Sequence, residues 1–88
     1  MNKTWTDKGW DGYEYWQGQD RKTLKQINKL LKDIERNGLL MGIGRPEALK
    51  GDKAGWYSRQ IDEANRLVYK FEDEKLVIAQ GKGHYDDK

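Results

Sequence analysis

Two side chains that can transfer protons, Glu47 and His84, lie far apart in the sequence. His84 is the only histidine among 88 residues, and Tyr85 follows it directly. Imidazole titrates near neutral pH, so a histidine is the most available proton donor or acceptor in a chain of this composition. Glu47 follows Pro46, whose ring restrains the local backbone and can hold a carboxylate in a defined place. Taken singly, each of the two residues is more simply explained as a solvated surface group.

Cationic side chains form a second candidate group. Arg59 and Arg66 lie on two predicted neighbouring strands, and pairing of those strands as a hairpin could project both guanidinium groups towards a common surface. Arginine suits phosphate because its planar fork donates two hydrogen bonds, although a solvated or ion-paired sheet face explains the pair equally well. Lys29 and Lys32 belong to a lysine-rich stripe on a predicted helix. Such a stripe is more often a solvated face than an RNA-docking face.

Together these residue types could cleave RNA. Its 2′-OH is an internal nucleophile, so an RNase needs only a base for that proton, an acid for the leaving 5′-oxygen, and cations around the phosphorane. Glutamate, histidine and arginine meet these needs without a metal or other cofactor, and we expect neither. The acidic groups at residues 72–74 and 86–87 lie in a predicted turn and a tail, where solvation explains them better than metal binding. Serine catalysis fits poorly, because Ser58 is the only serine and does not lie in a nucleophile elbow.

The composition excludes several classes of protein. Without cysteine there is no disulfide framework, thiol nucleophile or zinc ribbon. Charged residues make up 36% of the chain, but four tryptophans and five tyrosines argue against disorder. The net charge of +2 does not by itself identify a nucleic-acid binder. The longest apolar stretch, residues 39–43, is far shorter than the roughly 20 residues that span a bilayer, and no signal peptide is evident. We expect one domain over residues 1–88, in the cytoplasm and with no membrane association.

The elements that must position these side chains begin with two helices. A short strand is predicted over residues 3–6, and Asp7 is a plausible N-cap for a first helix with aromatic residues at intervals of three. The second helix follows Asp20 and ends at Asn37-Gly38. One of its sides is apolar and the opposite side is basic. The apolar stripe consists of Leu24, Ile27, Leu31 and Ile34, and the basic stripe of Lys22, Lys25, Lys29, Lys32 and Arg36.

The second half of the chain carries the strand signals. Residues 38–55 are rich in glycine and predict a loop, with strands to follow over residues 56–61, 66–71 and 75–80. The last strand is apolar on both faces, which indicates a central place in the sheet. The predicted fold is α+β, with two N-terminal helices packed on a small, mostly antiparallel sheet in the order β-α-α-β-β-β and room for one more strand.

Beyond these patterns, the chain closely resembles the YoeB (Txe) branch of the RelE toxin superfamily. The resemblance covers nearly the whole chain, and it depends on the order and spacing of several segments rather than on one motif. These segments are Trp10–Trp16, the lysine-rich helix, Pro46–Lys50, Gly55–Arg59, Asn65–Tyr69 and His84-Tyr85. One difference lies just before His84, where Gly81-Lys82-Gly83 replaces the arginine and aromatic residue of many relatives.

This resemblance implies a microbial-RNase-like fold and the toxin of a type II toxin–antitoxin module. Such toxins cleave mRNA in the A site of the 70S ribosome, are neutralised by a YefM-type antitoxin and tend to form homodimers. Carried over by position, Glu47 would be the general base and His84 the general acid. The other implied roles are phosphorane stabilisation by Arg66, substrate positioning by Tyr85, and phosphate contacts by Lys50 and Arg59.

Two other classes of function stay open from the sequence. A non-enzymatic toxin of the same fold would act by binding a partner such as DNA gyrase, and it would lack the acid–base pair. A plain basic RNA-binding module would use the lysine stripe and Arg59 but would not need His84. The presence of both Glu47 and His84 therefore favours the enzyme.

Overall fold

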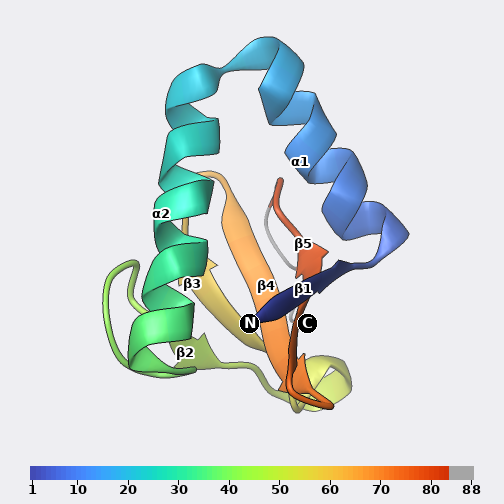
Figure 1. Cartoon of the computed structure of the whole chain (residues 1–88), viewed down its shortest axis with the longest axis vertical. Helices are drawn as coiled ribbons and strands as arrows, with labels where there is room; N and C mark the ends of the chain where they lie inside the picture. The colour runs from blue at the N-terminus through green and yellow to red at the C-terminus, as the bar shows by residue number, and fades with distance from the viewer. Residues whose placement is uncertain (84–88) are drawn as a thin grey trace.

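The computed structural model describes residues 1–83 and places two helices against one five-stranded sheet (Figure 1). The elements are β1 (Asn2–Trp5), α1 (Asp7–Gln19), α2 (Arg21–Asn37), β2 (Glu47–Ala48), a 3-10 turn (Gly51–Lys53), β3 (Tyr57–Gln60), β4 (Arg66–Glu72) and β5 (Lys75–Gln80). Across the sheet the strand order is β1-β5-β4-β3-β2. β1 pairs with β5 in parallel, and the other neighbouring strands are antiparallel. The predicted α+β fold is confirmed.

Helix α2 begins and ends where the sequence predicts. The carboxylate of Asp20 accepts hydrogen bonds from the backbone N–H groups of Lys22 and Thr23, at 3.0 and 3.4 Å, which caps the helix. Gly38 ends it with a positive φ of 93°. The buried side of the helix consists of Thr23, Ile27, Leu30, Leu31 and Ile34. Figure 1 shows α1 and α2 meeting near residue 20 and diverging from there.

Helix α1 packs unusually close to β5, which explains its glycines. Gly9 and Gly12 are buried, and a methyl group at Gly9 would collide with the backbone carbonyl oxygen of Ile78. Glycine lowers the helix propensity at these positions, but only a residue without a side chain allows α1 to pack this close to β5. The predicted cap at Asp7 was wrong, because the hydroxyl of Thr6 accepts the N–H of Gly9 at 3.1 Å and Asp7 lies in the first turn.

One face of the sheet carries the core. The core cluster joins α2 to the strands through Ile27, Leu30, Leu31, Ile34, Ile61, Leu67, Tyr69, Leu76 and Ile78. β5 lies between β1 and β4, so its apolar character on both faces correctly indicated an interior strand. The loop predicted through residues 38–55 was wrong at Glu47–Ala48, which pair with β3 and form the sheet edge. Neither of the helices in residues 1–83 is long and apolar enough to cross a membrane.

Candidate active site

The sheet face turned away from the helices brings two predicted site residues together. Glu47 pairs with Ser58, Ser58 with Val68, and Gln60 with Arg66. Directly paired residues point to the same face, and so do residues two apart on one strand. Glu47 and Arg66 therefore share a face, with one strand between theirs. Two strand spacings of about 4.8 Å and an offset of two residues along the strand, at about 3.4 Å each, place their Cα atoms roughly 12 Å apart. Side chains of this length can reach one phosphodiester placed between them.

The accessibility of these groups suits a substrate-binding role. Glu47 is exposed on its two-residue edge strand, and Arg66 is half-buried at the start of β4. Lys50 is exposed two residues past the end of β2, near the same edge of the sheet. A carboxylate can take a proton and a guanidinium can stabilise developing negative charge. The described part of this face thus carries one carboxylate and one guanidinium with the chemistry of a base and an anion-binding group.

The segment after β5 lies next to the start of β4, where Gly83 contacts Arg66. The backbone N–H of Arg66 donates to the carbonyl oxygen of Gly83 at 2.9 Å, and Gln80 Nε2 donates to the same oxygen at 2.8 Å. The N–H of Gly83 donates to Asn65 Oδ1 at 2.7 Å. The predicted residues His84 and Tyr85 lie outside the described residues, but they follow Gly83 directly in the sequence. Sequence reasoning missed the hydrogen bonds of Asn65 and Gln80 to Gly83, although a polar residue at the end of an apolar strand was a signal for Gln80.

Arg59 is not part of this site, and its predicted contact with RNA phosphate was wrong. Its side chain has no exposed surface, and all five guanidinium N–H groups are used. The acceptors are Tyr69 Oη (3.0 Å), Asp33 Oδ2 (2.5 Å), and the carbonyl oxygens of Ile43 (2.9 Å), Gly38 (2.8 Å) and Met41 (2.7 Å). The cause is register, because Arg59 pairs with Leu67 and therefore faces the core, away from Arg66. The alternation Tyr57, Arg59, Ile61 was the sequence signal for this face.

The Asp33 carboxylate balances the charge of Arg59, and the neutral Tyr69 hydroxyl accepts one of its N–H groups. Burial opposes ionisation of Asp33, but hydrogen bonds from Arg59, the backbone of Ile43 and Asn37 outweigh it and hold the pKa of that carboxyl below its usual value. Burial raises the pKa of the Tyr69 hydroxyl, which donates to the carbonyl of Leu39 at 2.7 Å. This network ties the segment leading from α2 towards Glu47 to the middle of the sheet.

Lys29 and Lys32 lie on another side of the molecule. Both are exposed on α2 and line a shallow hollow with Asp33, Arg36 and Ile43. The opposite side of α2 packs on the core face of the sheet, so the structure does not bring these lysines to Glu47. They form a separate basic surface.

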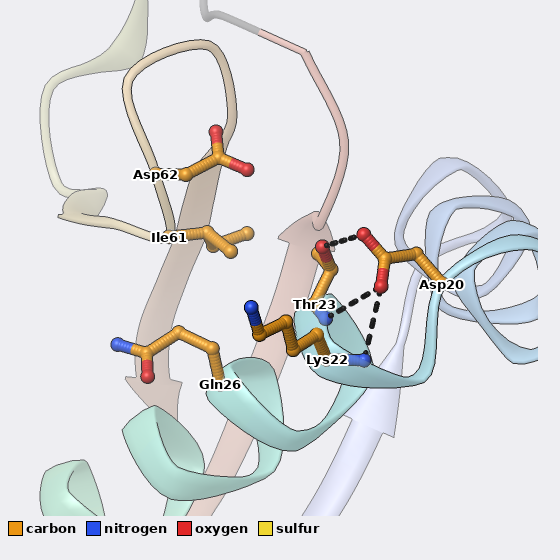
Figure 2. A pocket seen from close by; sticks show the side chains of 6 residues that line it. All are labelled: Asp20, Lys22, Thr23, Gln26, Ile61 and Asp62. Carbon is orange, nitrogen blue, oxygen red and sulfur yellow. Dashed lines mark hydrogen bonds between the residues drawn. The ribbon is translucent and has the colours of Figure 1, made fainter.

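A second hollow, of about 320 Å³, lies at the start of α2 (Figure 2). It is lined by Asp20, Lys22, Thr23, Gln26, Ile61 and Asp62. Figure 2 shows the Asp20 carboxylate turned to the backbone of Lys22 and to Thr23, whose hydroxyl donates to it at 2.8 Å. Asp62 accepts the N–H groups of Ala64 and Asn65, both at 2.8 Å. Both carboxylates therefore serve local structure, and this hollow is a weaker candidate for chemistry.

Comparison with known proteins gives consistent similarities. Residues 5–85 match the family described as YoeB-like toxin of bacterial type II toxin-antitoxin system. Toxin YoeB of Streptomyces coelicolor is 49% identical over 85 residues, which are 97% of this chain and 100% of that protein. A YoeB–YefM complex from Staphylococcus aureus contains a chain that is 46% identical, with a TM-score of 0.90, 97% of this chain covered and 98% of that one. The YoeB dimer from the same organism gives 47% identity, a TM-score of 0.90 and the same coverage.

Proposed function

The chain belongs to the YoeB-like toxins of bacterial type II toxin–antitoxin systems, and we propose that it is a ribosome-dependent endoribonuclease. It cleaves mRNA in the ribosomal A site and thereby inhibits translation. The observation that carries this proposal is the shared sheet face of Glu47 and Arg66, with Gly83 hydrogen-bonded to the backbone of Arg66 immediately before His84. In this proposal Glu47 is the base, Arg66 is the anion-binding group, and the acid follows Gly83, whose carbonyl oxygen accepts from the backbone of Arg66.

The chemistry needs no group beyond the side chains of this chain. Glu47 takes the proton from the RNA 2′-OH, and the 2′-oxygen attacks the adjacent phosphorus. Arg66 stabilises the negative charge of the phosphorane, and Lys50 contacts a neighbouring phosphate. His84 then protonates the leaving 5′-oxygen, while Tyr85 positions the substrate. The products are a 2′,3′-cyclic phosphate and a 5′-hydroxyl.

The direct test is incubation of the purified protein with programmed, translating ribosomes. Mapping of the mRNA ends should place cuts within the A-site codon, and end-group analysis should detect a cyclic phosphate and a 5′-hydroxyl. Intact mRNA on stalled ribosomes would favour the non-enzymatic toxin. Tight binding to free RNA without cleavage would favour the basic RNA-binding module.

Two partners follow from the relatives. YoeB of S. aureus is found in a complex with YefM and as a dimer. We propose that this chain likewise forms a homodimer and is neutralised by a YefM-type antitoxin. Its substrate is the ribosome-bound mRNA of the cytoplasm. The cationic side chains of Arg66 and Lys50 suit an acidic antitoxin segment for the same reason that they suit RNA.

The basic surface of α2 predicts a docking role that is separable from the chemistry. Reversing Lys29 and Lys32 together to glutamate should weaken ribosome binding and leave cleavage, once bound, nearly unchanged. Loss of two phosphate contacts should make the plot of log affinity against log salt shallower by about 1.4–1.8. Co-sedimentation with ribosomes across a salt series measures this slope. Reversal of Lys8 and Lys75, which are exposed on other elements, provides a control of equal charge. If the Lys29/Lys32 and Lys8/Lys75 variants had equal salt slopes, the lysine stripe would be a solvated face without a docking role.

Binding of the antitoxin predicts a large gain in stability. A partner that binds only the folded state at 100 times its Kd adds about 2.7 kcal/mol. For a domain of this size each kcal/mol raises the Tm by about 4–8 °C, so the gain is roughly 10–20 °C. Thermal melting with an acidic C-terminal peptide of a YefM-type antitoxin tests this, with a scrambled peptide of equal charge as the control. Equal shifts with both peptides would reduce the interaction to nonspecific charge attraction.

A further inference from the structure

The backbone N–H and the carbonyl oxygen of Gly83 are both hydrogen-bonded to residues of other segments. Its N–H donates to Asn65, its carbonyl oxygen accepts from Gln80 Nε2 and from the backbone of Arg66, and all three distances are between 2.7 and 2.9 Å. The φ of Gly83 is 84°, a left-handed conformation that favours glycine. The backbone at Gly83 is therefore held in a conformation that few other residues adopt.

We propose that Asn65 and Gln80 are positioning residues that fix where the segment bearing the general acid leaves the sheet. The proposal rests on the proposed function, because it gives the two side chains a role in RNA cleavage through His84. Consecutive Cα atoms are about 3.8 Å apart, so a displacement of Gly83 passes directly to the next residue.

Several features argue for positioning rather than for simple stabilisation of the strand. Gln80 is only 3% exposed, and its side-chain amide donates to the carbonyl oxygen of Gly83, which lies outside the strands. Asn65 lies at the end of the β3–β4 connection, so the two side chains approach Gly83 from different segments. Arg66, the anion-binding group, supplies the third contact from its own backbone. Gly83, the residue before His84, is therefore tied directly to the backbone of Arg66.

The test uses Gln80→Met, which keeps the side-chain volume and removes the donor. Misplacement of a catalytic group by about 1 Å can cost on the order of 10²-fold in rate. We expect single-turnover cleavage on ribosomes to fall at least about 10-fold, with ribosome affinity and Tm close to wild type. The decline in rate at high pH that a histidine acid produces should also flatten. Gln26→Met is the matched control, since Gln26 is half-buried on α2 beside the other hollow.

A double-mutant cycle with His84→Ala separates positioning from structure. If Gln80 acts through His84, Gln80→Met should change the residual rate of His84→Ala by less than about 2-fold. The positioning role alone would be overturned if Gln80→Met lowered the cleavage rate equally in the wild type and in His84→Ala. It would also be overturned if the wild type were active and Gln80→Met cleaved at the same rate. A wild-type chain that cleaves no ribosome-bound mRNA would overturn the proposed function and this role with it.

Discussion

Glu47→Ala should lower the rate of mRNA cleavage on the ribosome by about 10²–10⁴-fold, which is the usual contribution of a general acid or base. His84→Ala should cause a loss of similar size. Glu47 is exposed on a two-residue edge strand, so its removal takes away no core packing. Ribosome affinity and thermal stability should therefore stay near the wild type, and the loss should fall on the chemical step. Single-turnover cleavage at saturating ribosome concentration measures that step.

Two comparisons make this result specific. Glu14→Ala removes an exposed carboxylate from α1, away from the site, and should leave cleavage unchanged. Arg66→Lys keeps the charge but loses the planar fork, so it should recover only part of the activity lost in Arg66→Ala. Full toxicity of Glu47→Ala or of His84→Ala at matched expression would show that the residue has no part in proton transfer.

Most of the fold could be predicted from local patterns. The Asp20 cap and the apolar stripe of α2 are local signals. The cap is confirmed, and Ile27, Leu31 and Ile34 of the stripe are buried, whereas Leu24 is only half-buried and Leu30 was missed. The short strand β2 was missed because two residues carry no periodicity, and only pairing with β3 defines it. The close packing of Gly9 against Ile78 is likewise a tertiary event. From the sequence alone, Gly9 indicated only a residue that lowers helix stability.

The site was harder to predict because it depends on register. Arg59 and Arg66 have the same side chain and lie on paired strands, yet they point to opposite faces. A shift of one residue decides whether an arginine lies on the face of Glu47 or is buried as a structural group in the core. Arg59 lies two residues from both Tyr57 and Ile61 and therefore shares their apolar face, which would have identified it as the buried arginine. The hydrogen bonds at Gly83 involve backbone groups, which a side-chain motif does not report.

Removal of Arg59 should lower the free energy of unfolding and should not act through a lost contact with RNA. Arg59→Met keeps much of the volume but removes the cation that pairs with Asp33 and the donor to the carbonyl oxygens of Gly38 and Met41. Breaking a buried ion pair from one side typically costs 3–5 kcal/mol, in a domain whose total stability is about 5–15 kcal/mol. Urea denaturation should therefore show a much lower midpoint. Arg59→Lys should rescue little, because an ammonium has three donors where the guanidinium uses five.

The pH dependence identifies the ion pair as the cause of this loss. Since the folded-state pKa of Asp33 lies below its usual value of 3.8, the carboxylate contributes stability at neutral pH that is lost as pH falls through and below 3.8. Arg59→Met removes much of that contribution, so the gap in unfolding free energy between the two proteins should narrow in acid. Arg59 also ties down the carbonyls of Gly38, Met41 and Ile43 on the way to Glu47. A folded, equally stable Arg59→Met protein with impaired ribosome binding would instead restore Arg59 as a phosphate ligand.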